Sequence, residues 1–234
     1  MNSLREPLYE LRGVVKEFAG PTETVHVLRN IEAKIFRGEA LAILGASGSG
    51  KTTLLHLLGT LDTPSRGEIV FEGRDLAGLS TGQRAAFRNR ELGFVFQQHH
   101  LLPEFSTLEN VAMPGLIADL PWKEARRMAE EALAHVGLSQ RADFAVTTLS
   151  GGERQRAAIA RAVLLSPKVL LADEPTGSLD EATGRSVGDM LLQLNRELDM
   201  TLVVVTHNLE LASKMDRQLE LHAGELNAHT PCPI

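Results

Sequence analysis

The chain has 234 residues, of which 43% are hydrophobic and 23% are charged, and its formal net charge is -6. A chain of this length can bury a sizeable core, either as one domain or as one domain with an embedded subdomain. The acidic balance, without a run of lysine and arginine, argues against nucleic acid as the main partner.

The first part of the chain is predicted to lead from a β-rich edge into a nucleotide-binding loop. Residues 1–13 contain no hydrophobic stretch that could serve as a signal peptide. Residues 8–45 have the pattern of short strands, the last of them Ala40–Leu44. The next residues, GASGSGKT at 45–52, fit G-x-x-x-x-G-K-[ST], in which backbone N–H groups close on phosphate oxygens, the lysine reaches the β- and γ-phosphates and the hydroxyl ligates magnesium. We predict a helix over 51–59 and, before and within its first turn, a nucleotide-binding loop made of Gly45, Ala46, Ser47, Gly48, Ser49, Gly50, Lys51, Thr52 and Thr53.

The middle of the chain changes from strand to helix. The sequence GFVFQ at 93–97 resembles a strand and ends at Gln97, whereas residues 99–148 are predicted to form an α-helical insertion. Within it, Pro121 starts a helical pattern whose charged residues face outward. His99 and His100, at the start of the insertion, are interpreted as a surface pair rather than a metal site. The apolar positions of the pattern recur every three or four residues: Trp122, Ala125, Ala129, Ala132, Leu133 and Val136.

The string LSGGE at 149–153 predicts the start of a second helix. Ser150 and Glu153 have the spacing of a capping box, and the helix is expected to run over 151–166 and to stop before Pro167. An isolated S-x-x-E would mean only a well-capped helix. The two glycines each cost helix propensity on the order of 1 kcal/mol relative to alanine, which favours a backbone left bare for a ligand. We therefore predict an anion site for phosphate made of Leu149, Ser150, Gly151, Gly152 and Glu153.

Polar residues follow two buried strands in the last third of the chain. The apolar run Val169 to Ala172 ends in Asp173 and Glu174, and the apolar run Thr201–Val205 is followed by Thr206 and His207. Adjacent acids are commonly a solvated turn, but at the carboxyl end of a parallel strand they lie where open α/β sheets bind ligands.

The chain ends in a short polar tail from about Ala228 that contains its single cysteine, Cys232. One cysteine excludes an intrachain disulfide framework and suits a reducing cytoplasm, and its position is one residue short of a prenylation box. The sequence contains no run of about 18 or more apolar residues, the length that a membrane-spanning helix needs. We therefore expect a soluble chain that would take part in transport only as a peripheral subunit.

Together these motifs resemble the ATP-binding cassette (ABC) family over nearly the whole chain. The resemblance implies an α/β P-loop NTPase of ABC type, with a mostly parallel sheet core, an antiparallel β edge and an inserted α-helical subdomain. Residues 1–234 would form a single nucleotide-binding domain. Its ATP-binding core would comprise about 1–98 and 162–227, its helical subdomain about 99–161 with LSGGE, and its tail 228–234.

The resemblance also assigns catalytic roles. Asp173 would hold Mg²⁺ through water, with Thr52 and Gln97 as further ligands. Glu174 would be the general base that polarises the attacking water. His207 would contact the γ-phosphate and orient the nucleophile. The implied cofactors are ATP and Mg²⁺.

A second set of implied roles concerns nucleotide recognition and assembly. Phe18 is the candidate to stack on adenine, and Ser178 to Asp180 resemble the D-loop. In this family the signature LSGGE closes on the ATP of a second copy, so a homodimer would sandwich two nucleotides and neither subunit alone would complete a site.

The segments 99–117 and 203–226 resemble the ATPase subunits of lipoprotein-releasing transporters of Gram-negative bacteria. That resemblance implies a peripheral position on the cytoplasmic face of the inner membrane. Integral membrane permease subunits would handle the lipoprotein cargo and dock a coupling helix on 99–117. The sequence departs from the pattern at Gln98, Gly115 and Asn208, and Gln98 and Gly115 lie near the expected docking groove.

Two alternatives share the same nucleotide chemistry. One is the ATPase of a macrolide- or peptide-type exporter, and the other is a cell-division-type ATPase that acts as a signalling module. A regulator without turnover is disfavoured by Glu174 and His207, and a GTPase is disfavoured because the chain has no N-K-x-D string.

Overall fold

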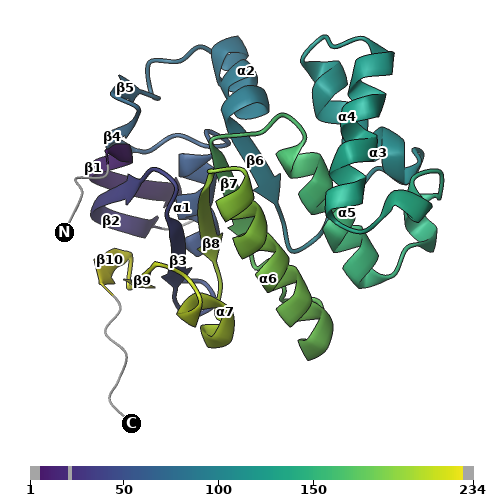
Figure 1. Cartoon of the computed structure of the whole chain (residues 1–234). Helices are drawn as coiled ribbons and strands as arrows, with labels where there is room; N and C mark the ends of the chain where they lie inside the picture. The colour runs from purple at the N-terminus through teal and green to yellow at the C-terminus, as the bar shows by residue number, and fades with distance from the viewer. Residues whose placement is uncertain (1–5, 21–22, 229–234) are drawn as a thin grey trace.

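The computed structural model describes residues 6–20 and 23–228, so Cys232 lies outside the described residues. Two sheets form the body of the molecule, shown on the left and in the centre of Figure 1. The smaller sheet is antiparallel, with strand order β2-β1-β4-β5. Its strands are β1 (Pro7–Ala19), β2 (Thr24–Phe36), β4 (Arg66–Phe71) and β5 (Arg74–Asp75).

The larger sheet has strand order β10-β9-β3-β8-β7-β6, in which only the β10–β9 pair is antiparallel. Every residue of β3 and β8 is buried, as expected for parallel strands covered on both faces. The strands are β3 (Ala40–Leu44), β6 (Leu92–Val95), β7 (Val169–Asp173), β8 (Thr201–Val205), β9 (Arg217–His222) and β10 (Glu225–Ala228).

The fold class expected from the sequence is confirmed, but the prediction for residues 8–45 was wrong in detail. Instead of short strands, the chain forms two 13-residue strands. Ala40–Leu44 pairs with β8 and β9 in the parallel sheet rather than with the antiparallel edge. Local patterning cannot reveal this, because sheet membership depends on partners far along the chain.

Helices flank the sheets and build a separate lobe, which lies on the right of Figure 1. The lobe contains α3 (Thr107–Ile117), α4 (Trp122–His135) and α5 (Gly151–Val163), with short 3₁₀ turns at Ser139–Arg141 and Val146–Thr148. The body carries α1 (Lys51–Leu58), α2 (Thr81–Glu91), α6 (Glu181–Glu197) and α7 (Leu209–Ser213). No helix among the described residues is both long and apolar enough to cross a membrane.

The helical lobe matches the predicted insertion with small differences. The apolar positions of the pattern are buried except for Trp122, which fits the helical spacing but is 44% exposed. Helix α5 ends at Val163, earlier than the predicted residue 166. Buried residues of the lobe and of the sheet face that it covers form one continuous apolar core, so packing joins the lobe to the body.

Candidate functional site

A cleft of about 740 Å³ lies at the carboxyl ends of strands β3, β7 and β8. This is the edge at which ligands bind in open α/β sheets. The cleft brings together five of the predicted elements: the loop, Gln97, Asp173, Glu174 and His207. Its lining residues are Val27, Ser47, Gly48, Gly50, Lys51, Thr52, Thr53, Gln97, Asp173, Glu174 and His207.

The loop between β3 and α1 is shaped to present backbone N–H groups. Gly50 caps α1 in a left-handed conformation, with φ of 101°, which a residue with a side chain rarely adopts. The Lys51 ammonium donates hydrogen bonds to the carbonyls of Gly45 (2.7 Å) and Ala46 (3.0 Å), so its side chain is held against the loop. Gly45, Ala46 and Ser49 support this turn but do not line the cleft. The N-terminus of α1 and the lysine together suit a polyphosphate.

Thr52 and Asp173 form an oxygen-rich corner of the cleft. Burial raises the pKa of Asp173, the hydrogen bond from the Thr52 hydroxyl lowers it, and the neighbouring Glu174 charge raises it further. Gln97 lines the same cleft and adds an amide oxygen. A hydroxyl, a carboxylate and an amide oxygen are ligands that suit Mg²⁺, so the residues present fit that ion.

Glu174 is held by the end of the neighbouring strand. One carboxylate oxygen accepts hydrogen bonds from the Thr206 hydroxyl (2.9 Å) and the His207 backbone N–H (3.3 Å), and the other lies 2.9 Å from His207 Nδ1. The carboxylate side chain is 14% exposed, whereas that of His207 is 72% exposed. The Glu174 backbone has φ of 45°, an uncommon conformation for a residue with a side chain. The strand ends therefore fix the carboxylate in the cleft beside an open histidine.

The signature LSGGE does not line the cleft. Its predicted capping box is confirmed: the Ser150 hydroxyl oxygen accepts from Glu153 N–H at 3.2 Å, and Glu153 accepts from Ser150 N–H at 2.8 Å. Asp180 is also outside the cleft, where it caps the start of α6. Within one copy, the structure thus separates the signature and Asp180 from the cleft.

The two glycines of the signature have different reasons to be there. A Cβ on Gly152 would lie 2.5 Å from Thr183 Cγ2 of α6, so this glycine permits a close helix contact. A Cβ on Gly151 would meet no atom nearer than 3.6 Å. Gly152 is buried against α6, so the prediction that both glycines leave backbone bare for a ligand was wrong for Gly152.

Phe18 remains a prediction as the adenine-stacking residue. Its ring is 41% exposed and lies 4.8 Å from the Lys16 ammonium. Phe18 pairs with Val25 on the hairpin whose Val27 lines the cleft, but Phe18 itself does not line it.

Two functional contacts were missed at the sequence level. The first is the hydrogen bond from Thr206 to Glu174, since the sequence analysis gave Thr206 no role of its own. Asp173 pairs with Val205 in the adjacent parallel strands, and this pairing brings Glu174 and Thr206, the next residues of each strand, together. Register between the two strands would have revealed this contact.

The other missed contact involves the His99–His100 pair. Arg161 of α5 donates hydrogen bonds to the backbone carbonyls of His100 (2.6 Å) and His99 (2.9 Å). His100 is exposed, but His99 is half-buried, and burial beside Arg154 lowers the pKa of its imidazole. The surface-pair interpretation is therefore wrong for His99, because this segment is fastened to α5.

The positions flagged as departures from the family pattern have local explanations. Asn208 caps α7 by accepting a hydrogen bond from Leu211 N–H at 3.0 Å, a role that aspartate and asparagine share. A Cβ on Gly115 would lie 3.1 Å from Ala125 Cβ, inside the helical lobe.

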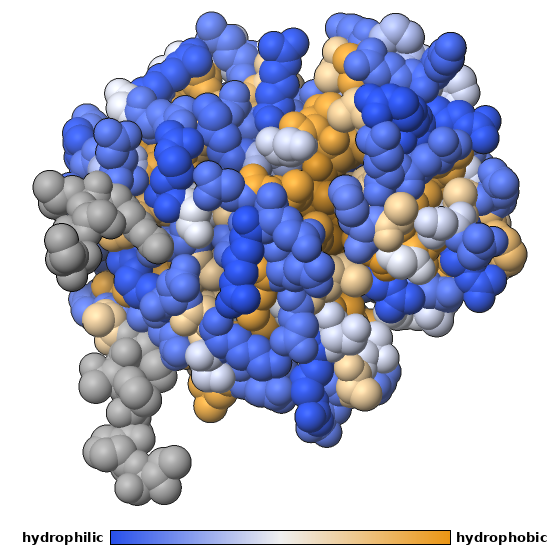
Figure 2. All heavy atoms as spheres, in the orientation of Figure 1, coloured by the Kyte–Doolittle hydropathy of each residue, from blue (hydrophilic) through white to orange (hydrophobic). Residues whose placement is uncertain are grey.

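An apolar groove of about 450 Å³ separates α2 and β6 from the helical lobe. Figure 2 shows the orange apolar atoms that gather in the depression between these two parts. Neither Gln98 nor Gly115 lines the groove, although both were expected near it. Its lining consists of Leu61, Ala85, Arg88, Asn89, Leu92, Phe94, Phe96, Met113, Pro114, Ile117, Arg161, Ala162, Leu165 and Pro167.

Known proteins resemble the chain in sequence and in structure. Residues 28–177 match the family model described as ABC transporter. The chain is 63% identical over 232 residues to the lipoprotein-releasing system ATP-binding protein LolD of Nitratidesulfovibrio vulgaris, which covers 99% of this chain and 100% of that protein. It is 61% identical over 219 residues to the protein of the same name from Oleidesulfovibrio alaskensis, and the match covers 94% of this chain and 95% of that protein.

Two solved structures resemble the fold of this chain. A solved dimeric structure of a bacterial ABC transporter cassette is 37% identical, with a TM-score of 0.87 over 97% of this chain and 100% of that chain. A solved dimeric post-hydrolysis state of an ATP-binding cassette, bound to ADP and Pi, is 36% identical, with a TM-score of 0.87 and the same coverage.

Proposed function

This chain belongs to the ABC transporter family, and we propose that it is the ATP-hydrolysing subunit of a lipoprotein-releasing system on the cytoplasmic face of a bacterial inner membrane. The chain is an ATPase of the ABC type. The observation that carries the lipoprotein assignment is the identity of 63% and 61%, over nearly the full length, to two proteins named for lipoprotein release.

Within one copy, the cleft supplies the groups that bind the nucleotide and act on the attacking water. Residues 45–53 bind the phosphates, and Lys51 supplies the positive charge that binding and charge stabilisation need. Thr52, Gln97 and Asp173 would hold Mg²⁺, which neutralises phosphate charge when bound. Glu174, fixed by Thr206 and His207, accepts the proton of the attacking water.

A second copy completes each site. Because the Ser150 helix N-terminus lies outside the cleft of its own chain, it is free to bind the γ-phosphate held by the partner. We therefore propose a head-to-tail homodimer with two sandwiched nucleotides, and the likeness to dimeric cassettes supports it. ATP binding closes this dimer, and loss of the γ-phosphate lets it open.

The apolar groove is the proposed docking site for the membrane subunits. Met113, Pro114 and Ile117 come from the segment 99–117 that was expected to receive a coupling helix, and they line the groove. Ile117 is 63% exposed there. An amphipathic helix of an integral membrane permease, of the LolC/LolE kind, would cover these side chains. The permeases would handle the lipoprotein cargo.

Ile117→Asp is expected to abolish membrane association while the ATPase activity of the isolated subunit stays near wild type. An unpaired carboxylate in an apolar docking site costs several kcal/mol, which corresponds to at least about a hundredfold in affinity. Co-purification with the permease subunits and ATPase assays measure the two effects. Ile117→Val, which keeps the apolar surface, serves as the control. Retained association of the aspartate variant would contradict docking in this groove.

The cargo assignment is tested by depleting the protein and fractionating a labelled outer-membrane lipoprotein. We expect the lipoprotein to accumulate in the inner membrane. Normal sorting after depletion would contradict lipoprotein release and leave the exporter or cell-division role in its place.

A further inference from the structure

The signature carries a negative charge at the helix end where the proposed dimer would bind the partner's phosphate. Glu153 lies in the first turn of α5, and its carboxylate accepts the Ser150 N–H at 2.8 Å. Hydrogen bonds from the Ser150 backbone and side chain lower the pKa of Glu153, and Arg141 lowers it further, so the group is ionised near neutral pH. An anion here stabilises the helix N-terminus, but it also repels the γ-phosphate of the partner's ATP.

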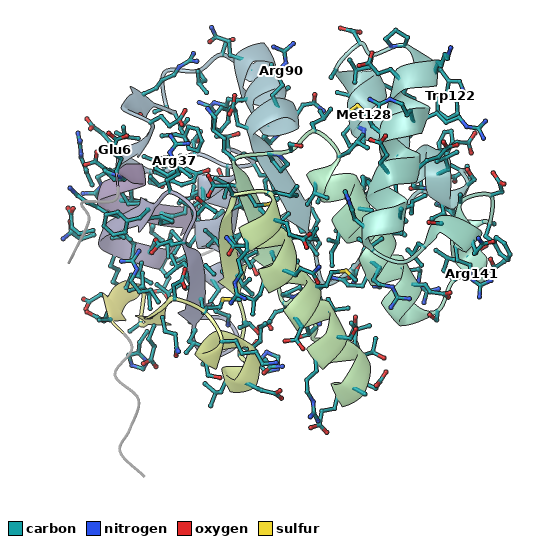
Figure 3. All side chains as sticks on the ribbon, viewed as in Figure 1. Glu6, Arg37, Arg90, Trp122, Met128 and Arg141 are labelled. Carbon is teal, nitrogen blue, oxygen red and sulfur yellow. The ribbon has the colours of Figure 1, made fainter. Side chains whose placement is uncertain are left out.

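Arg141 faces this carboxylate from another element. Its Nε donates to Glu153 Oε1 at 2.8 Å, while the other oxygen of Glu153 remains on Ser150 N–H. The Arg141 side chain is 43% exposed and that of Glu153 is 18% exposed. Figure 3 labels Arg141 at the edge of the helical lobe. The arginine therefore neutralises Glu153 without displacing it from the capping box.

The aromatic ring of Phe144 packs against the Arg141 guanidinium. The guanidinium carbon lies 4.8 Å from the centre of the Phe144 ring, a cation–π contact. The Phe144 carbonyl accepts hydrogen bonds from both the backbone N–H and the hydroxyl of Thr107, each at 2.9 Å. Thr107 belongs to α3, so the arginine's aromatic platform is anchored to a second helix.

This ion pair differs from the other arginine–glutamate pairs of the helical lobe. Arg126–Glu130 and Arg127–Glu131 join positions four residues apart on one exposed helix face, with every side chain at least 50% exposed. Pairs of that kind contribute little to stability. The Arg141–Glu153 pair instead spans 12 residues and ends on the motif that faces the partner.

We propose that Arg141 is a positioning residue of the signature: it neutralises Glu153 and holds it on the Ser150 N–H, so that the helix N-terminus can accept the partner's phosphate. The inference rests on the proposed sandwich dimer. The Ser150 hydroxyl oxygen accepts from Glu153 N–H, and the hydroxyl also acts on the Glu153 carboxylate. Because Arg141 binds that carboxylate as well, the hydroxyl proton can turn to the phosphate while Glu153 stays neutralised. Arg141 thus acts on the ATP of the other copy and not on the ATP in its own cleft.

Arg141→Ala tests this role. We expect unchanged ATP affinity of the monomer, but an ATP-driven dimer weakened by about tenfold and a similar loss in turnover, because an unneutralised carboxylate then faces the phosphate. Dimer formation is measured by light scattering in the Glu174→Gln background, where hydrolysis does not consume the ATP. Arg127→Ala, which removes an exposed pair of the same type, is the matched control and is expected to behave as wild type.

A double-mutant cycle separates charge neutralisation from packing. Glutamine at position 153 can still accept the Ser150 N–H in a capping box but carries no charge. In the Glu153→Gln background, Arg141→Ala should therefore cost nothing further in dimerisation. If Arg141→Ala is as harmful there as in the wild-type background, Arg141 acts through packing and the inference is overturned. A failure of the Glu174→Gln reference protein itself to dimerise with ATP is a different result, because it contradicts the proposed sandwich.

Discussion

Glu174→Gln is expected to keep ATP affinity near wild type and to lower turnover by about a hundredfold or more, because the amide cannot accept the proton of the attacking water. The amide oxygen can still accept the hydrogen bonds from the Thr206 hydroxyl and the His207 N–H, so the local turn should survive. Stalled hydrolysis should leave a stable ATP-bound dimer. Fluorescent-nucleotide titration, steady-state ATPase assays and size-exclusion chromatography measure the three effects.

Asp189→Asn is the control for this experiment. Asp189 is an exposed acid on α6 that pairs with Lys214, outside the cleft, and its variant should hydrolyse ATP at the wild-type rate. Wild-type turnover in the Glu174 variant would remove Glu174 from the role of base. A monomer at saturating ATP and Mg²⁺ would count against the sandwich.

Lys51→Ala and Ser150→Arg are both expected to abolish hydrolysis, but for different reasons. Lys51→Ala removes a charged hydrogen bond to the phosphates, a loss of about 1.5–3 kcal/mol or about ten- to a hundredfold in ATP affinity. Ser150→Arg leaves the cleft of its own chain intact, since Ser150 does not line it, so ATP affinity should stay near wild type. The arginine instead fills the anion site offered to the partner, and the ATP-bound dimer should not form.

Mixing the two variants tests the head-to-tail arrangement. In the heterodimer, the native cleft of the Ser150→Arg copy meets the native signature of the Lys51→Ala copy, which restores one complete site. We expect recovery of part of the wild-type ATPase activity at a ratio of one to one. Equal loss of ATP affinity in both single variants, or a mixture as inactive as its components, would contradict the arrangement.

The sequence motifs predicted which residues meet in the cleft more accurately than the hydrophobic pattern predicted strand length and sheet membership. The loop at 45–52, the acids Asp173 and Glu174 at the end of β7 and the histidine after β8 converge because each lies at the carboxyl end of a parallel strand, and these ends share one edge of the sheet. Residues 8–45 were misassigned because strand length and sheet membership depend on pairing with β4, β8 and β9, which are distant in sequence. Local hydrophobic alternation does not carry that information.

Contacts between segments that only folding brings together could not be predicted from the sequence either. Gly152 was interpreted through its helix propensity, but its lack of a side chain is required by Thr183, 31 positions later. Arg141 received no role at all, because only the folded lobe brings it to Glu153. Trp122 fitted the helical period and yet is exposed, since a helix end can leave the surface that its middle covers.

Arg161 donates hydrogen bonds to the backbone carbonyls of His99 and His100, and this contact connects the cleft segment to α5. Gln97 lines the cleft two residues before His99, and Ser150 caps the other end of α5. In the proposed dimer, occupancy of one cleft is therefore linked to the donors offered to the opposite cleft. Linkage of binding free energies is reciprocal, so the factor by which one nucleotide changes the affinity for the other is the same in both directions. We expect the coupling to be positive, because both nucleotides close the same proposed dimer, and removing the Arg161 side chain should bring the Hill coefficient for ATP closer to one.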